Sequence, residues 1–309
     1  MTAFIILHYM AVDCTLACIK NVRELSGSKH IVVVDNASPD GSGTILRDSF
    51  AGSSDVTVLL NGCNEGYARG NNQGIEYVVE RLDAEFVVVL NNDVEVLQRD
   101  FCERISASYA EHPFDVLGPD IISAFSGIHQ SPKQLETITL EVVRAKMRYL
   151  RRNLNPVLLY LSSGEKSCTS IYKKCLRRRR EKAGIDGSVE YEGVVLHGAC
   201  VIFSARWLRG HKRPFCDETY MYYEMEILDY LGKREGYVSR YDPALQVRHL
   251  QNVSTQVCYK SMIKRSRFVI YNLLESCGTA ESLILSDLQE KQRLHNSTLH
   301  SVDSTVVTF

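Results

Sequence analysis

Asn91, Asn92 and Asp93 follow directly on a short apolar run that extends from Phe86 to Leu90. The run is rich in Val and has no polar alternation, which predicts a central strand covered on both faces. In open α/β sheets, ligands bind just beyond the carboxyl ends of the strands. One carboxylate and two carboxamides at that point could hold a hard cation that carries phosphates. The alternative is a simple turn, because Asn and Asp are common turn residues.

Two earlier segments place polar or glycine residues at comparable positions. The apolar run Ile31–Val34 ends in Asp35 and Asn36, and an Asp at a strand end can accept hydrogen bonds from a base or ribose. The alternative for Asp35 is a loop cap. Residues 66–74 carry glycine at every fourth position, which predicts a loop that lets backbone approach a ligand and leads into a helix N-terminus favourable to phosphate. The alternative is a turn that caps the helix.

The elements that must position these residues alternate between strands and helices. The predicted strands cover residues 3–9, 31–34, 56–60, 86–90, 116–122 and 194–203. The predicted helices cover residues 12–25, 44–50, 73–82, 101–109 and 259–275. Strands and helices in alternation, with carboxylates at strand ends, predict a doubly wound parallel sheet that binds a nucleotide.

Composition sets the broad class of the protein. With 309 residues, 45% hydrophobic content and a net charge of -1, the chain can bury a large core and is neither a disordered chain nor a general nucleic-acid binder. The N-terminus has no basic region followed by an apolar core, and no apolar run reaches membrane-spanning length. Ten scattered cysteines without a C-x-x-C pair are expected to be reduced. The expected location is the cytoplasm.

A basic segment divides the chain. Residues 125–190 lack strand signals and are expected to form helices over 135–152 and 170–183. Between residues 144 and 182 there are thirteen Lys or Arg against two Glu. One interpretation of such a run is a helix face exposed to solvent. The other is attachment of residues 144–182 to an anionic membrane surface, with the apolar residues 158–161 nearby. Nucleic-acid binding is disfavoured, because aromatic residues are not interleaved.

Several motifs, taken in order, resemble the family 2 glycosyltransferases, and more narrowly the rhamnosyltransferase-like members that build bacterial surface polysaccharides. The segments that carry the resemblance are 33–42, 64–74, 90–93, 198–202, 215–224, 236–237 and 242–249. The resemblance covers roughly residues 3–124 and 194–275. It implies the α/β GT-A fold, in which a Rossmann-like, mostly parallel central sheet is flanked by helices, here with an added basic helical insert. The implied division is 1–124 for the nucleotide-sugar half, 125–193 for the insert, 194–275 for the acceptor-binding and catalytic half, and 276–309 for a polar, loosely ordered tail.

The resemblance also implies the roles of individual residues. Asn91–Asp93 occupies the position of the family's D-x-D motif, so Asp93 and the late His249 would hold Mg²⁺ or Mn²⁺ against the donor diphosphate. The first Asp of that motif is replaced by Asn91. The residues expected to contact the nucleotide sugar are Tyr9, Asp35, Asn36, Gly66, Tyr67, Asn71, Asn91 and Asn92.

An inverting transfer is a direct displacement, and it needs a general base on the acceptor side. The family carries this base in an acidic block, which here reads from Tyr223 to Asp229. Alignment back from residues 236–237 puts Met225 and Ile227 where the family usually has acids. Glu224 is therefore the predicted base, and Glu226 is the alternative; on a helix they would point to different faces. The residues expected to line the acceptor pocket, or else to cap a helix, are Asp217 and Glu218.

The predicted function is inverting hexosyl or deoxyhexosyl transfer from a nucleoside diphosphate sugar to a hydroxyl of a glycan or lipid-linked saccharide, with no nucleic-acid partner. One alternative is a non-catalytic or weakly active sugar-nucleotide-binding protein, which the changed residues Asn91 and Met225 suggest. A second is a sugar nucleotidyltransferase, disfavoured because no Gly-rich basic loop follows the first strand. A third, a dinucleotide-dependent oxidoreductase, lacks its G-x-G-x-x-G motif.

Overall fold

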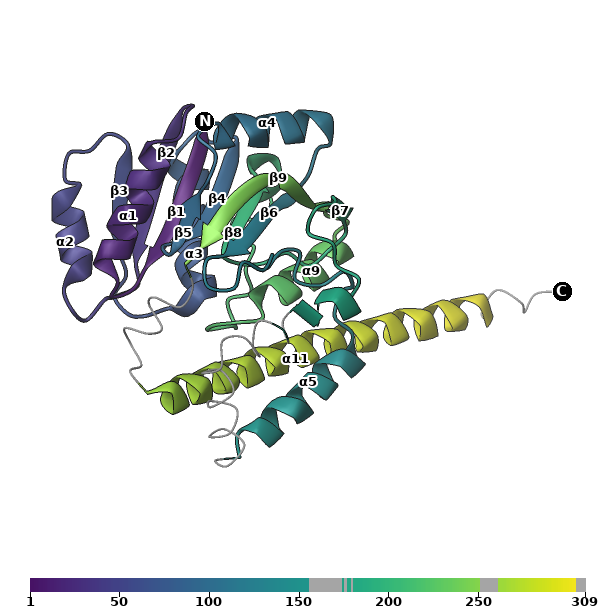
Figure 1. The fold of residues 1–309 in the computed structure, drawn as a ribbon. Helices are drawn as coiled ribbons and strands as arrows, with labels where there is room; N and C mark the ends of the chain where they lie inside the picture. Colours follow the sequence, from purple (N-terminus) through teal and green to yellow (C-terminus); the bar gives the residue numbers. More distant parts are fainter. Residues whose placement is uncertain (156–173, 175–176, 179, 251–260, 304–309) are drawn as a thin grey trace.

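The computed structural model describes residues 1–155, 174, 177–178, 180–250 and 261–303. Within this part of the chain, nine strands form one sheet in the order β3-β2-β1-β4-β8-β6-β9-β5, with β7 paired to β9 (Figure 1). Helices lie against the sheet, and a pair of helices forms a further layer beside it. The expected α/β fold with a mostly parallel central sheet is therefore confirmed.

The first half of the sheet is parallel. Strand β1 pairs in parallel with both β2 and β4, and β2 pairs in parallel with β3. Helical crossovers connect these strands, as parallel pairing requires. The strands are β1 (Thr2–His8), β2 (Lys29–Asp35), β3 (Val56–Leu60) and β4 (Phe86–Asn91). The connecting helices are α1 (Val12–Arg23), α2 (Ser42–Ser49) and α3 (Gly66–Arg81).

The second half of the sheet is mixed. Strand β8 (Cys200–Ser204) runs antiparallel between β4 and β6 (Val116–Ser123), and β6 pairs in parallel with β9 (Ser239–His249). The two short strands β5 (Val94–Val96) and β7 (Tyr191–Glu192) are antiparallel to β9. The strand predicted over 194–203 begins later than expected, at Cys200. Before Cys200, the β-pairing of this segment is an isolated bridge between Gln134 and Val195.

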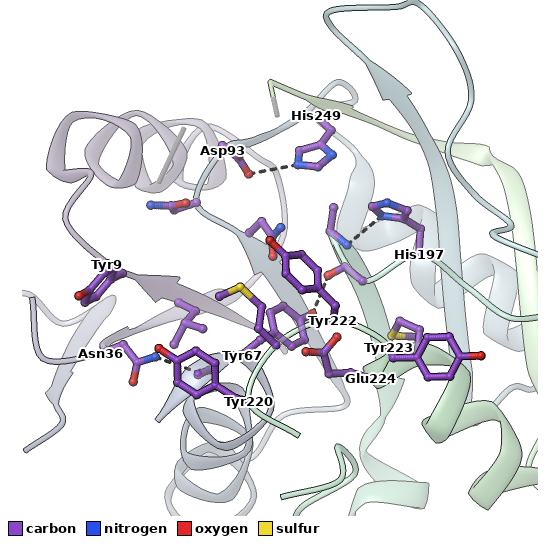
Figure 2. Close-up of a pocket in the computed structure, with 18 of the residues that line it drawn as sticks. Tyr9, Asn36, Tyr67, Asp93, His197, Tyr220, Tyr222, Tyr223, Glu224 and His249 are labelled. Atoms are coloured by element: carbon purple, nitrogen blue, oxygen red, sulfur yellow. Dashed lines mark hydrogen bonds and ion pairs between the residues drawn. The ribbon is translucent and has the colours of Figure 1, made fainter. Parts of the chain in front are cut away.

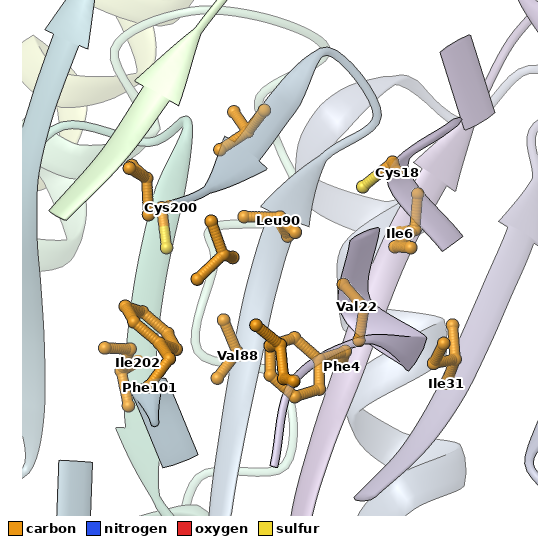
Figure 3. Packing of buried hydrophobic residues seen from close by; sticks show 14 of the residues in the cluster. Phe4, Ile6, Cys18, Val22, Ile31, Val88, Leu90, Phe101, Cys200 and Ile202 are labelled. Carbon is orange, nitrogen blue, oxygen red and sulfur yellow. The ribbon is translucent and has the colours of Figure 1, made fainter. Parts of the chain in front are cut away.

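The core lies on both faces of the central strands. Alternate residues of one strand point to opposite faces, so Phe4 and Val88 pack with α1 and α4 (Phe101–Glu111), as Figure 3 shows for Val22 and Phe101. On the other face, Ile5 and the alternate residues of the neighbouring strands pack against α3. Full burial of one such side chain contributes about 1.5–3 kcal/mol. Burial on both faces explains why these strands read as unbroken apolar runs.

Among the described residues of the second half, two long helices form the added layer. Helix α5 (Leu140–Asn153) lies beside α11 (Met262–Asp303) in Figure 1, and α9 (Glu224–Arg234) packs between them and the sheet. The short α8 (Ala205–Leu208) follows β8. The buried residues that join these helices include Met147, Ile227, Cys277 and Ile284.

The prediction of a loosely ordered tail after residue 275 is wrong for residues 276–303, and residues 304–309 lie outside the described residues. Helix α11 continues across that boundary to Asp303. Its buried face is built from small residues such as Ser276, Cys277 and Ala280, which give little hydrophobic periodicity but allow close helix packing. The other boundaries of the predicted division stay a prediction.

The predicted helix at 135–152 exists but begins at Leu140, where Thr139 accepts a hydrogen bond from the Val142 N–H as its N-cap. Half of the helix expected over 170–183, and all of the apolar residues 158–161, lie outside the described residues. Among the described residues, no helix combines the length and the apolar character that crossing a membrane requires.

Candidate functional site

A cavity of about 630 Å³ opens at the carboxyl ends of β1 and β4, a volume typical of sites for ligands the size of a nucleotide. The polar residues in its lining include Asn36, Asn64, Asn91, Asn92, Asp93, Gln130 and His249. Asp93 and His249 lie side by side and form a polar end of the cavity (Figure 2). The aromatic and apolar residues in the lining include Tyr9, Met10, Tyr67, Tyr220, Met221, Tyr222, Met225 and Phe268.

The turn that joins β4 to β5 carries the polar end. Asp93 Oδ1 lies 3.3 Å from His249 Nε2, and His249 Nδ1 lies 2.9 Å from Gln130 Oε1. These contacts orient the imidazole and carboxylate together, as Figure 2 shows. Asn92 Nδ2 donates to Thr15 Oγ1 at 3.0 Å, which fixes the turn to α1. The turn is therefore held by α1 and β9, and Gln130 supports the His249 ring.

The donor set of this turn fits a hard divalent cation in part. The described residues contain no group of three or more His, Cys, Asp or Glu side chains that could hold a metal ion. Asp93 and His249 offer two ligands. Mg²⁺ commonly binds through one or two carboxylates and takes its other ligands from water and substrate phosphates. The residues present are consistent with a cation that binds together with a diphosphate.

Asp35 and Asn36 have different surroundings. Asp35 is buried, accepts a hydrogen bond from Ser38 Oγ at 2.6 Å and lies under Gly43, where an added Cβ would come within 2.1 Å of its Oδ2. The Asp35 side chain caps its own loop and is not among the residues that line the cavity. Asn36 does line it, while its Nδ2 donates to Gly66 O at 2.9 Å.

The glycine-rich segment is a helix rather than the loop that the sequence predicted. Helix α3 begins at Gly66, and glycines four residues apart lie on one face. A Cβ at Gly70 or Gly74 would come within 2.6 Å of Leu7 or Ile5 of β1. The glycines thus permit close packing of α3 on the sheet, and this requirement explains their spacing.

Residues at the start of α3 make hydrogen bonds to other parts of the protein. The Tyr67 N–H donates to Tyr220 O at 2.7 Å, and the Tyr67 hydroxyl donates to Gly198 O at 2.6 Å. Burial, together with the nearby Glu224 carboxylate, raises the pKa of Tyr67 well above its ordinary value. Asn71 is buried and donates to Tyr67 O, outside the cavity lining. These hydrogen bonds fix the start of the helix against the rest of the protein. Of Tyr67 and Asn71, only Tyr67 lines the cavity.

Among the acidic residues of the block 223–229, Glu224 is the one that lines the cavity. It is the first residue of α9, and the two residues before it, Tyr222 and Tyr223, have left-handed backbone with φ of 70° and 72°. Such a conformation costs roughly 1–3 kcal/mol at each non-glycine residue and tends to occur at functional sites. Burial raises the pKa of the Glu224 carboxyl to about 7. Its Oε1 is buried without a hydrogen-bond partner within the described residues.

Glu226, the alternative base, points away from the cavity lining. Its Oε2 lies 2.8 Å from Lys133 Nζ and its Oε1 lies 3.7 Å from Lys146 Nζ. Burial raises the pKa of this carboxyl, but the two lysines outweigh burial and hold the pKa below its ordinary value. Glu226 is therefore an ion-paired carboxylate, whereas Glu224 is poised to exchange a proton.

The two residues expected at the acceptor pocket lie elsewhere. Asp217 is paired with Arg213 at 2.8 Å and accepts from Asn72 Nδ2 at 2.9 Å. Glu218 lines a groove between α5 and α11. Neither is among the residues that line the cavity.

Several lining residues were not predicted. Gln130 and Lys133 come from the irregular segment before α5, and Phe268 comes from α11, and none belongs to a recognisable motif. His197 had a signal, since with Gly198 it interrupts an apolar run. Burial lowers the pKa of His197 well below its ordinary value. The imidazole therefore lines the cavity in its uncharged form.

Comparison with protein families matches residues 3–176 to the family described as "Glycosyl transferase family 2". The chain belongs to glycosyltransferase family 2. The family predicted from the motifs, and with it the glycosyltransferase class, is confirmed. The matched region includes β1 to β6 and therefore the turns after β2 and β4 that line the cavity.

A curated relative of this family 2 chain is the low-salt glycan biosynthesis hexosyltransferase Agl10 of Haloferax volcanii. The two are 34% identical over 106 residues, which cover 34% of this chain and 33% of Agl10. The chain therefore aligns with only about a third of the length of this relative.

Among solved structures, the chain resembles GalNAc-T7 with UDP, GalNAc and Mn²⁺ (TM-score 0.52, 11% identity, covering 82% of this chain and 44% of that chain). It also resembles S. aureus TarS 1-349 in complex with UDP (TM-score 0.50, 14% identity, covering 87% of this chain and 64% of that chain). These similarities confirm the expected GT-A fold.

Proposed function

We propose that this family 2 member transfers a hexosyl or deoxyhexosyl group, with inversion, from a nucleoside diphosphate sugar to an acceptor hydroxyl, and that Glu224 is the general base. The observation that carries the proposal is the buried Glu224 carboxylate, which lines the same cavity as Asp93 and has an oxygen without a hydrogen-bond partner among the described residues. An acceptor hydroxyl would donate to that oxygen. A pKa near 7 suits a base that works near neutral pH.

The polar end of the cavity is the proposed donor subsite. Asp93 and His249 would hold Mg²⁺ or Mn²⁺, which would neutralise charge on the departing diphosphate. Asn36, Asn91 and Tyr9 line the same cavity and would contact the nucleotide sugar. The structures of TarS with UDP and of GalNAc-T7 with UDP and Mn²⁺ support a nucleoside diphosphate donor and a divalent cation.

The part of the cavity next to Glu224 is the proposed acceptor subsite. Tyr220, Tyr222 and Phe268 line the cavity, and in Figure 2 the Tyr222 ring lies between Glu224 and the pair of Asp93 and His249. Aromatic rings offer apolar faces to sugar rings, while their hydroxyl groups can bond to sugar hydroxyls. The acceptor would be a glycan or a lipid-linked saccharide of a surface polysaccharide, and the role of Agl10 in glycan biosynthesis supports this class.

The competing candidate is a sugar-nucleotide-binding protein without transfer activity. Met225 lines the cavity at a position where the family resemblance leads us to expect an acid. A nucleotidyltransferase would instead need a basic loop after β1, whereas that rim carries Tyr9 and Met10.

Two measurements test the proposal. Thermal shift with UDP-, GDP- and dTDP-sugars, each with and without Mn²⁺, identifies the donor. Proton NMR of the anomeric signal after transfer then reports whether the configuration is inverted. Glu224→Gln should abolish transfer and keep donor binding. Asp229→Asn is the matched control, because Asp229 is also buried on α9 but pairs with Lys233 at 3.1 Å. Donor binding without transfer in the unaltered protein would favour the binding-protein candidate.

We also propose that the basic segment binds an anionic membrane surface on the cytoplasmic side. In its described part, Arg148, Arg151 and Arg152 are exposed on α5 beside the exposed Tyr149. Basic residues beside an exposed aromatic side chain suit anionic headgroups. Such attachment would bring the cavity close to a lipid-linked acceptor.

A further inference from the structure

A charge cluster around the buried Glu226 carboxylate joins the helical insert to α9. The Glu226 carboxylate is 1% exposed and lies between Lys133, 2.8 Å away, and Lys146, 3.7 Å away. Lys146 is on α5 and Lys133 lies in the segment before it. Both cations that surround this α9 carboxylate therefore come from the insert.

Lys146 makes a second contact with the start of α9. Its Nζ lies 4.1 Å from the centre of the Tyr223 ring, a distance at which a cation is attracted to an aromatic face. Tyr223 is the N-cap of α9 and is 2% exposed. Its side chain packs in one cluster with Met147 of α5 and Cys277 of α11. Lys146 thus contacts the residue before Glu224 and the residue two positions after it.

The contacts of Lys146 lie next to the backbone of Tyr222 and Tyr223, which directs the Glu224 side chain into the cavity. Tyr222 and Tyr223 are left-handed, and non-glycine residues keep this conformation only where their surroundings fix it. We propose that Lys146 is a positioning residue for the Glu224 carboxylate, because it holds Tyr223 through its ring and Glu226 through its carboxylate. Lys146 itself is not among the lining residues, so it acts through these two neighbours. The inference rests on the proposed role of Glu224 as the base.

The charged and titratable groups around Glu224 come from three elements. Tyr67 faces it from α3, Lys133 from the segment before α5, and Glu226 from α9. Loss of the Lys146 charge would leave Lys133 as the main cation for Glu226. Less positive charge would then remain for Glu224, and its carboxyl would hold its proton to a higher pH.

Lys146→Met tests the inference by steady-state kinetics with a saturating donor. Misplacement of a catalytic group by about 1 Å can cost on the order of a hundredfold in rate, and we expect kcat to fall on that order. The KM of the donor should change by less than about twofold, since the donor subsite is untouched. Lys146→Arg should recover most of the rate, because Arg keeps the charge and stacks on aromatic rings.

Arg234→Met is the matched control. Arg234 lies at the far end of α9 and pairs with the buried Asp287 of α11 at 2.8 Å, so this variant also removes a cation that ties α9 to the helical layer. Its melting temperature should fall, while kcat should not. Equal kcat losses in Arg234→Met and Lys146→Met, or an unchanged kcat in Lys146→Met, would overturn the inference. Glu226→Gln, which removes the carboxylate that links the lysines, is the second variant and should also lower kcat.

A readout without catalysis separates this inference from the proposed function. The carboxyl ¹³C signal of Glu224, assigned by its loss in Glu224→Gln, should titrate at higher pH in Lys146→Met than in the unaltered protein or in Arg234→Met. If the unaltered protein binds donor but transfers no sugar, the proposed function fails, while this titration still tests whether Lys146 acts on Glu224. The same titration midpoint for Glu224 in Lys146→Met and in the unaltered protein would overturn the inference.

Discussion

Replacement of Glu224 by Gln should make the protein more stable at pH 8 and inactive at the same time. The pKa of this carboxyl rises from its ordinary value of 4.5 to about 7 on folding, because burial disfavours the charged form. One pH unit of displacement corresponds to about 1.4 kcal/mol, so the ionised carboxylate costs the folded state about 3 kcal/mol. Gln has nearly the same shape and carries no charge, and it removes that cost.

The sign of the effect depends on pH. The pKa of the Glu224 carboxyl is higher in the folded state than in the unfolded state. The folded state therefore binds more protons than the unfolded state between about pH 4.5 and 7. The unaltered protein therefore loses stability as pH rises through this window, and the loss is complete above it. The variant and the unaltered protein should have similar free energies of unfolding at pH 4, and should differ by about 3 kcal/mol at pH 8.

Urea denaturation at pH 4, 6 and 8 measures this difference, and the transfer assay at pH 8 measures the activity. Loss of a general base is expected to lower the rate about 10²- to 10⁴-fold. In the unaltered protein, kcat/KM should rise with pH through about 7 as the base ionises. A variant that is less stable than the unaltered protein at pH 8, or that keeps full activity, would refute the assignment.

Three further predictions concern other parts of the molecule. Asp93→Ala should abolish Mn²⁺-dependent transfer while circular dichroism stays unchanged, and normal activity would remove the metal-site assignment. Gly66→Ala should lower the free energy of unfolding in urea by about 2 kcal/mol or more, because its Cβ would lie 2.1 Å from Tyr220 O at a φ of +74°; an unchanged midpoint would contradict this. Arg148→Gln and Arg151→Gln should each weaken sedimentation with anionic vesicles, by about 1 kcal/mol of binding free energy, and equal binding to neutral vesicles would argue against a membrane role.

The fold and the polar end of the cavity followed closely from local sequence. A strand that is buried on both faces must be apolar at every position, so the end of each run was visible where Asp35 and Asn91 begin. Parallel strands bring such ends to one edge, and Asn36 and Asp93 do line one cavity. Asp35 shows the limit of this reasoning, because its oxygens are used by the loop that follows it.

Patterns with two physical explanations could not be resolved from sequence. Glycines four residues apart suit a ligand-binding loop and equally suit one face of a helix packed on a sheet; contact with Ile5 and Leu7 decided for the helix. The small residues around Cys277 looked like a polar tail, and their burial against α5 became visible only once the chain had folded.

The sequence by itself determined the family, the alternation of strands and helices from β1 to β4, and a short list of candidate acids. Only the tertiary structure separated Glu224 from Glu226, because the difference between them lies in side chains far away in the chain. Lys133 and Lys146 reach Glu226 from the insert and keep it charged and paired. Glu224 has no such ion pair among the described residues, and burial raises its pKa to about 7. The proton affinity of a buried carboxyl depends on these surroundings, and they come from segments that meet only in the folded protein.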